Sequence, residues 1–312
     1  MRAFVFPGQG SQAIGMGKEL HDSFLAAKEV FQEVDDSLSQ SLYKLMTEGT
    51  IEELTLTENT QPALMAVSMA VIKVLEKEAG VDIAKLSSYV LGHSLGEYSA
   101  LCAAGVFSLS DTAKLLKTRG LAMQQAVPKG LGGMAAVMGV NLDKAKELAA
   151  KAAEDQVCVA ANDNADGQIV ISGHMEAIDR AVAIASEFGA KRCIKLAVSA
   201  PFHCSLMKPA AEKMQEALDN VTMNNPRIPV IANVTAAETT DTKAIKKLLV
   251  EQVTGSVRWR ESMLYLKERS VDNIIEAGSG KVLSGLSKRI LPDAQSLSIS
   301  SPQDIENFIK TL

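Results

Sequence analysis

The chain has 312 residues, of which 47% are hydrophobic and 22% charged, a composition typical of a soluble globular protein. This length exceeds what one compact core usually needs, so we expect two domains or one domain with an inserted lobe. The net charge of −5, without a basic tail, argues against a nucleic-acid partner. The N-terminus lacks a signal-peptide core, and the longest apolar-rich run, 63–75, is interrupted by Ser68 and Lys73. We therefore expect a cytoplasmic protein without a membrane segment.

The first predicted strand, Ala3–Phe6, runs into the loop Pro7–Gln12. This loop nearly matches the dinucleotide-binding fingerprint, which also requires an acidic residue at the end of a second strand about 20 residues further on. The corresponding stretch, 30–38, is polar and helical in pattern, so nucleotide binding is disfavoured. The loop can instead supply backbone N–H groups, or the amide of Gln9, to a neighbouring site.

Apolar residues at helical spacing predict the next elements. The predicted elements are a helix from about Gly17, a helix from the turn Asn59–Pro62 to Glu78, a buried strand at Leu86–Leu91, and a helix capped at Ser110–Asp111 that continues through Val127.

The predicted strand Leu86–Leu91 leads into Gly92-His93-Ser94-Leu95-Gly96, which fits the nucleophile-elbow pattern. In this pattern a serine occupies a strained strand-to-helix turn, and glycines two residues away on either side leave room for the backbone. The following residues, 97–104, are predicted to form a helix closed by Gly105, whose N-terminus would stabilise negative charge beside Ser94. A glycine-rich turn with an incidental serine remains the alternative on this motif alone.

Arg119 lies on the apolar flank of its predicted helix, because its neighbours at helical spacing are leucine, alanine and methionine. A charged side chain that faces inward needs a partner. Arg119 therefore forms an internal salt bridge, extends its charged end to solvent, or binds a substrate carboxylate, which a guanidinium holds in bidentate fashion.

The stretch 129–198 differs in character from the rest of the chain and is predicted to form a small lobe with the order β-α-β-β-α-β, the ferredoxin-like unit. Its predicted elements are a strand at Met134–Gly139, a helix at Leu142–Ala153, strands at Val157–Asn162 and Gln168–Ser172 around the turn Asp163–Gly167, a helix at Met175–Phe188 and a strand at Lys191–Val198.

His203 follows the lobe on a loop that Pro201 separates from the last strand. A loop histidine is usually structural, but a histidine downstream of an elbow serine is what the chemistry requires as general base. The remaining predicted elements are helices at Ala210–Leu218, Ala244–Gln252, Trp259–Lys267 and Lys281–Leu291, with strands at Ile228–Asn233 and Asn273–Ala277.

The order and spacing of these motifs resemble the malonyl-CoA:acyl-carrier-protein transacylase family of fatty-acid synthesis over essentially the whole chain. The motifs that carry the resemblance are Phe6–Gln12, Gly92–Tyr98, Arg119, Pro201–His203, Val257–Trp259 and Glu276–Lys281. The resemblance implies an α/β fold, with an α/β-hydrolase-like large subdomain (1–128 and 199–312) and an inserted ferredoxin-like small subdomain (129–198).

The resemblance also implies a ping-pong transfer of malonyl from malonyl-CoA to holo acyl carrier protein. The roles that it implies are Ser94 as nucleophile, His203 as base, the backbone N–H groups of Gln9 and Leu95 as oxyanion hole, Arg119 as carboxylate clamp, the backbone carbonyl of Gln252 as orienting group for the histidine, and His93, Asn162 and Phe202 as further substrate contacts. No metal, cofactor, membrane or nucleic acid is implied, and a monomer is expected.

Three alternatives stay open from the sequence. A polyketide-type acyltransferase and a serine–histidine thioesterase or esterase would use the same machinery, and a non-catalytic carrier-binding module would keep the fold. Arg119 favours transfer of an acidic acyl group over hydrolysis, and the intact serine, histidine and arginine argue against a non-catalytic module.

Overall fold

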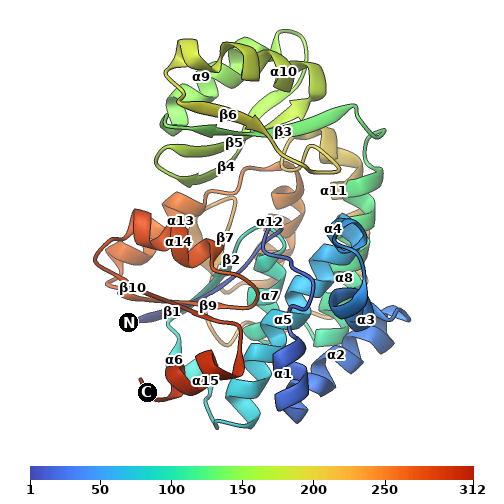
Figure 1. Ribbon diagram of the computed structural model, residues 1–312, viewed down its shortest axis with the longest axis vertical. Helices are drawn as coiled ribbons and strands as arrows, with labels where there is room; N and C mark the ends of the chain where they lie inside the picture. The colour runs from blue at the N-terminus through green and yellow to red at the C-terminus, as the bar shows by residue number, and fades with distance from the viewer.

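The computed structural model describes residues 1–312 and contains two β-sheets (Figure 1). The larger sheet has six strands in the order β10-β9-β1-β2-β7-β8, all parallel except β8, which is antiparallel to β7. Its strands are β1 (Arg2–Phe6), β2 (Tyr89–Gly92), β7 (Val230–Ala232), β8 (Ala237–Thr239), β9 (Asn273–Ala277) and β10 (Gln295–Ile299). Because β1 and β2 are parallel neighbours, Phe6 pairs with Gly92 and the loops that follow both strands start side by side.

Strand β1 shows how the larger sheet is held between two layers. Phe4 and Phe6 belong to a core cluster of 59 buried residues. Ala3 and Val5 belong to a second cluster of 14 buried residues. Successive side chains of a strand point to opposite faces, so a strand buried on both faces is a continuous apolar run. This explains why Ala3–Phe6 was predictable as a strand.

Helices from distant parts of the sequence cover the two faces. The large cluster joins the sheet to α1 (Lys18–Ser23), α2 (Leu25–Leu38), α3 (Leu42–Glu48), α4 (Ile51–Thr55), α5 (Thr57–Lys77), α6 (Ile83–Leu86), α7 (Gly96–Ala103), α8 (Leu109–Gln125), α11 (Lys208–Asp219), α12 (Thr242–Thr254) and α15 (Pro302–Ile309). The smaller cluster joins it to α13 (Trp259–Glu268) and α14 (Val282–Ile290). No helix combines the length and hydropathy that a membrane span requires.

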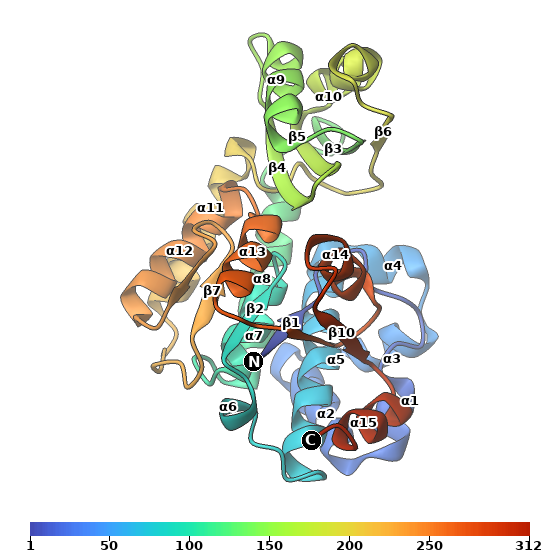
Figure 2. The same ribbon diagram turned by 90° about the vertical axis from the view of Figure 1, so that its left-hand side faces the viewer.

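The smaller sheet has four antiparallel strands in the order β4-β5-β3-β6. Its elements are β3 (Gly132–Met138), α9 (Leu142–Ala153), β4 (Cys158–Ala165), β5 (Gln168–His174), α10 (Met175–Ile184), the 3-10 turn η1 (Ala185–Phe188) and β6 (Arg192–Lys195). A separate core cluster joins this sheet to α9 and α10. Both views place these elements together at one end of the molecule (Figures 1 and 2). The predicted element order for this stretch is therefore confirmed.

Several predicted boundaries were wrong. The helix predicted from Gly17 is two helices, because Phe24 between α1 and α2 has an extended backbone. The predicted turn Asn59–Pro62 lies inside α5, which begins at Thr57 because the side chain of Gln124 on α8 accepts from the Thr57 N–H at 3.1 Å. Such a long-range cap leaves no local signal in the sequence.

Further corrections concern ends of elements. Helix α8 is capped by Ser108, whose hydroxyl accepts from the backbone N–H of Asp111, not at Ser110–Asp111. Strand β4 continues through Asp163 to Ala165, because its pairing with β5 extends to the pair Ala165 and Gln168. Strand β6 ends at Lys195, short of the predicted Val198, and residues 196–198 line a cavity instead. Strands β8 and β10 were not predicted, since β8 has three residues and β10 is an edge strand rich in serine.

Candidate active site

Ser94 lies on a sharp turn between β2 and α7, as the sequence predicts. Its backbone has φ of +53°, a left-handed conformation that costs energy for any residue other than glycine. A Cβ on Gly92 would lie 2.0 Å from the carbonyl carbon and oxygen of Gly96, and a Cβ on Gly96 would lie 2.2 Å from the carbonyl oxygen of Phe6. Only glycine fits at these two positions, so the elbow depends on both.

Asn233, which follows β7, fixes the elbow from the neighbouring strand. The Ser94 N–H donates to Asn233 Oδ1 at 2.8 Å, and Asn233 Nδ2 donates to the Gly92 carbonyl at 2.7 Å. These bonds satisfy two backbone groups that the strained turn leaves without a partner in the sheet. The asparagine therefore holds the turn in its strained conformation.

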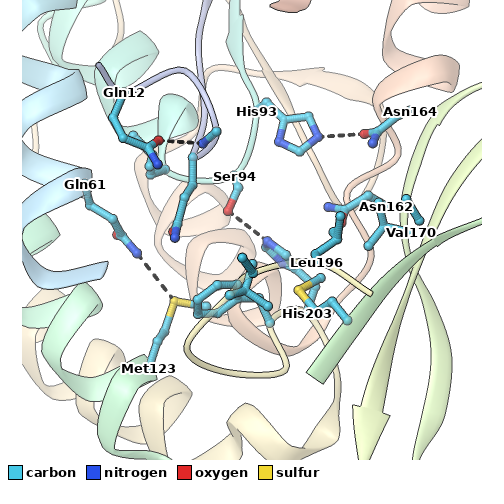
Figure 3. Close-up of a pocket in the computed structure, with 18 of the residues that line it drawn as sticks. Gln12, Gln61, His93, Ser94, Met123, Asn162, Asn164, Val170, Leu196 and His203 are labelled. Carbon is cyan, nitrogen blue, oxygen red and sulfur yellow. Dashed lines mark hydrogen bonds between the residues drawn. The ribbon is translucent and has the colours of Figure 1, made fainter. Parts of the chain in front are cut away.

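His203 contacts the serine from the loop after the small sheet (Figure 3). The Nε2 atom of His203 lies 2.8 Å from Ser94 Oγ. On the other side of the ring, Nδ1 lies 2.8 Å from the Gln252 carbonyl oxygen and 3.1 Å from the Gly255 carbonyl oxygen. Since both of these are acceptors, Nδ1 carries the proton and Nε2 accepts from the serine hydroxyl.

The His203 ring is held neutral by its surroundings. The side chain is buried, and burial together with the positive charge of Arg119 lowers the pKa of His203 to about 3. No carboxylate orients the ring; the two backbone carbonyls do so. The arrangement is a serine–histidine pair in which the neutral imidazole presents Nε2 as an acceptor to the serine hydroxyl.

Arg119 is 1% exposed and has no acidic partner within ion-pairing distance. Its Nη1 donates to Gln61 Oε1 at 2.9 Å, and its Nη2 donates to Gln252 Oε1 at 2.8 Å and to Ser94 Oγ at 3.1 Å. Its Nε is buried without any acceptor. Burial lowers the pKa of Arg119. The internal salt bridge that the sequence left open is therefore absent, and the buried carboxylate of Glu97 is linked to Arg119 only through the amide of Gln252.

A cavity of about 380 Å³ opens in front of these groups. Among its lining residues are eight that the sequence singled out: Gln9, His93, Ser94, Leu95, Arg119, Asn162, Phe202 and His203. The ninth, Gln252, lies behind Arg119 and His203. The backbone N–H groups of Gln9 and Leu95 donate to no protein acceptor, so both remain free for a ligand.

His93 and Asn162 join the cavity to the small sheet. His93 Nε2 lies 2.8 Å from Oδ1 of Asn164 on β4, and burial lowers the pKa of His93 (Figure 3). Asn162 is buried in the same strand. The cavity is thus built from the end of the larger sheet and one face of the smaller.

Comparison with known proteins agrees with this geometry. A model of the acyl transferase domain family matches residues 3–293. The malonyl CoA-acyl carrier protein transacylase of Bacillus subtilis is 47% identical over 311 residues, covering 99% of this chain and 96% of that protein. The transacylase of Escherichia coli K12 is 43% identical over 300 residues, covering 96% of each chain. The chain belongs to the malonyl-CoA:acyl-carrier-protein transacylase family.

Solved structures support the same family. The acyl-carrier-protein S-malonyltransferase of Bartonella henselae has a TM-score of 0.97 and 52% identity, covering 99% of this chain and 98% of that one. A malonyl transacylase in complex with the acyl-carrier protein of a type II polyketide synthase has a TM-score of 0.96 and 38% identity, covering 100% of this chain and 99% of that one.

The sequence did not single out four polar residues that form hydrogen bonds in and behind the active site of this transacylase. They are Gln61, Glu97, Asn164 and Asn233. One signal could have found Gln61, because several polar residues open a helix that is otherwise apolar. Asn233 ends a predicted strand at the sheet edge where the elbow lies, and ligands bind at such edges. Glu97 and Asn164 carry no local signal.

Proposed function

We propose that this protein transfers the malonyl group from malonyl-CoA to the phosphopantetheine thiol of holo acyl carrier protein, through a malonyl-serine intermediate, and so supplies fatty-acid elongation. One observation carries the proposal: the buried Arg119 lacks an acidic partner and donates to Ser94 Oγ at 3.1 Å. A cation at this position fits an acyl group that bears a carboxylate.

In the first half-reaction Ser94 Oγ attacks the thioester carbonyl carbon while its proton passes to His203 Nε2, 2.8 Å away. The tetrahedral intermediate carries its negative charge on the former carbonyl oxygen. The free N–H groups of Gln9 and Leu95 stabilise that charge, and loss of one such donor typically costs about 10²–10³ in rate. When the carbon–sulfur bond breaks, the imidazolium returns the proton to the leaving thiolate of CoA.

The second half-reaction runs the same steps in reverse order. His203 takes the proton of the carrier's phosphopantetheine thiol, and the thiolate attacks the malonyl-serine ester. The carbon–oxygen bond of the ester then breaks and Ser94 recovers its proton. The carbonyl of Gln252 keeps His203 in one tautomer through both halves.

The remaining cavity residues determine which acyl group the cavity accepts. Phe202 narrows the cavity where an α-substituent of the acyl chain would lie, so it favours malonyl over branched homologues. His93 and Asn162 contact the substrate from the elbow and from β4. No metal or cofactor takes part in the proposed steps.

The proposal includes the finer architecture. Residues 1–128 and 199–312 form an α/β-hydrolase-like catalytic subdomain, supported by the parallel sheet with the serine directly after β2. Residues 129–198 form an inserted ferredoxin-like subdomain, supported by the strand order β4-β5-β3-β6. We expect the protein to act in the cytoplasm as a monomer.

The test is intact-protein mass spectrometry after brief mixing with malonyl-CoA. Wild type is expected to gain one malonyl group, which Ser94→Ala loses and Arg119→Ala greatly reduces. Addition of holo acyl carrier protein should discharge the adduct, whereas a thioesterase would discharge it into water without a carrier. An adduct formed equally well from acetyl-CoA, and indifferent to Arg119, would contradict the proposed role of the arginine.

The type of carrier is the second question, because a similar malonyl transacylase is solved in complex with the acyl-carrier protein of a type II polyketide synthase. Discharge of the malonyl adduct by fatty-acid and by polyketide holo carrier proteins should be compared at equal concentration. Faster discharge by the fatty-acid carrier supports the proposed pathway, and the reverse order favours a polyketide role.

A further inference from the structure

Two buried side chains behind the elbow take no part in the proposed chemistry. Glu97 on α7 is 2% exposed, and Gln252 on α12 is fully buried. Glu97 Oε2 accepts from the Asn233 N–H at 3.0 Å and from Gln252 Nε2 at 2.8 Å. Neither residue lines the cavity, so neither reaches a bound acyl group.

The amide of Gln252 contacts both the carboxylate clamp and the nucleophile. Its Oε1 accepts from Arg119 Nη2 at 2.8 Å. Its Nε2 donates to the Ser94 carbonyl oxygen at 2.9 Å as well as to Glu97. The contact with His203 uses only the backbone carbonyl, so a change of the Gln252 side chain leaves the orientation of the histidine intact.

Glu97 and the Ser94 carbonyl together decide which way this amide points. An amide group can be inserted in two orientations that exchange its oxygen and its nitrogen. Glu97 Oε2 presents an acceptor to Gln252 whether or not the other carboxyl oxygen carries a proton. Nε2 of Gln252 must therefore face Glu97, and Oε1 must face Arg119. The opposite orientation would place the Gln252 N–H₂ group against the Arg119 guanidinium. It would also place the Gln252 oxygen against the Glu97 oxygen.

The orientation of Arg119 follows from these contacts. Gln252 holds Nη2 and Gln61 holds Nη1, so the guanidinium plane is fixed on both sides. Three of its five N–H groups are used by protein acceptors, which leaves one N–H of Nη1 and the buried Nε–H without a protein acceptor. A fixed guanidinium binds a carboxylate with little loss of freedom, whereas a mobile one does not place the thioester beside Ser94.

We propose that Glu97 and the side chain of Gln252 form a buried relay that positions Arg119, and that this relay sets the preference for acyl groups that bear a carboxylate. The inference rests on the proposed malonyl transfer. Both are positioning residues, because they act through Arg119. Without the relay Ser94 keeps the contact of its N–H with Asn233 and of its hydroxyl with His203, so acylation by a neutral donor continues.

The experiment compares the rate of Ser94 acylation by malonyl-CoA, followed by rapid quench and intact mass, with acylation by p-nitrophenyl acetate, a neutral donor. Gln252→Met keeps the length and the backbone carbonyl but removes the amide. It should slow malonyl acylation about 10- to 100-fold, the usual effect of a lost hydrogen bond to a charged group. Acylation by the neutral donor should change less than about threefold, on the same principle.

Glu97 is tested by a pair of variants. Glu97→Gln retains an acceptor oxygen for Gln252 and should keep the ratio of malonyl to neutral acylation near the wild-type value. Glu97→Leu removes one of the two acceptors of Gln252 Nε2 and should lower the ratio in the same direction as Gln252→Met does. Thr112→Val is the matched control, because it removes a buried hydrogen bond of α8, the helix of Arg119, away from the site. It should leave the ratio unchanged.

The decisive arm is the double variant. In an Arg119→Ala background, Gln252→Met should have no further effect on the ratio, since the relay sets the preference for malonyl through the arginine. If Gln252→Met slowed acylation by malonyl-CoA and by p-nitrophenyl acetate equally, the relay would have only a structural role and the inference would be overturned. The inference would also be overturned if the effects of Arg119→Ala and Gln252→Met on the ratio were additive in the double variant. If wild type forms no malonyl adduct, the proposed function itself fails; a normal wild-type adduct with unchanged variants defeats the relay alone.

Discussion

The acid–base state of His203 gives a prediction that can be worked through to a number. Burial, with a contribution from Arg119, lowers the pKa of His203 to about 3 in the folded protein. In the unfolded chain the pKa of a histidine is about 6.5. The unfolded state therefore takes up a proton first as the pH falls, and stability is lost between about pH 6.5 and pH 3. Each pH unit below the pKa of the unfolded state costs about 1.36 kcal/mol of unfolding free energy. A pH of 5 is about 1.5 units below that pKa, so the free energy of unfolding falls by about 2 kcal/mol.

The perturbation is His203→Asn, which removes the titrating group. Urea unfolding of both proteins at pH 7 and at pH 5 gives four free energies of unfolding. Wild type should lose about 2 kcal/mol more than the variant between the two pH values. All other titrating groups are common to both proteins and cancel in the difference. Equal losses in the two proteins would mean that the imidazole titrates alike in both states, and the reasoning that keeps it a neutral base would be refuted.

Three further predictions test the surroundings of the site. Gly92→Ala places a Cβ 2.0 Å from the carbonyl group at the start of α7, so the free energy of unfolding in urea should fall by about 3 kcal/mol or more; a stable, active variant would contradict the packing argument. Phe202→Ala enlarges the cavity, and the rate of acylation by methylmalonyl-CoA relative to malonyl-CoA should rise about 10- to 100-fold, whereas an unchanged ratio would exclude the ring as the barrier. Asp163→Asn weakens the contact of this buried carboxylate with Arg260 at 3.0 Å and should lower the free energy of unfolding by about 1–3 kcal/mol. The matched control Asp166→Asn, exposed and 3.8 Å from the same guanidinium, should cost less than about 0.5 kcal/mol, and equal costs would show that burial of the pair does not matter.

The elements that the sequence predicted best are those whose signal is local. β1 and β9 are short apolar runs, and α9 and α13 show an apolar face at helical spacing, so each was placed within a residue or so of its observed bounds. Two of the elements that were predicted wrongly depend on distant partners. Helix α5 gains its first turn from a glutamine on α8, and β10 becomes a strand only because β9 offers it an edge.

The active-site residues also divide into those with a local sequence signal and those that depend on distant partners. Residue type and motif sufficed to name Ser94, His203 and Arg119, because a strained serine turn, a downstream loop histidine and an inward-facing arginine are each unusual in themselves. The polar residues that support them, such as Asn233 and Glu97, look ordinary along the chain. Their importance arises only from what lies next to them.

The sequence by itself determined the strand, turn and helix around Ser94, the order of elements in the small sheet and the presence of one inward cation. Only the tertiary structure decided that these groups meet. His203 lies 109 residues from Ser94 along the chain, and Gln252 lies 158 residues away, yet both contact the serine. The physical reason is the parallel sheet, which brings the carboxyl ends of β1, β2 and β7 to one edge, where loops far apart in sequence converge. The same convergence gives Arg119 two glutamine side chains as partners and no carboxylate within ion-pairing distance, which no reading of its own helix could establish.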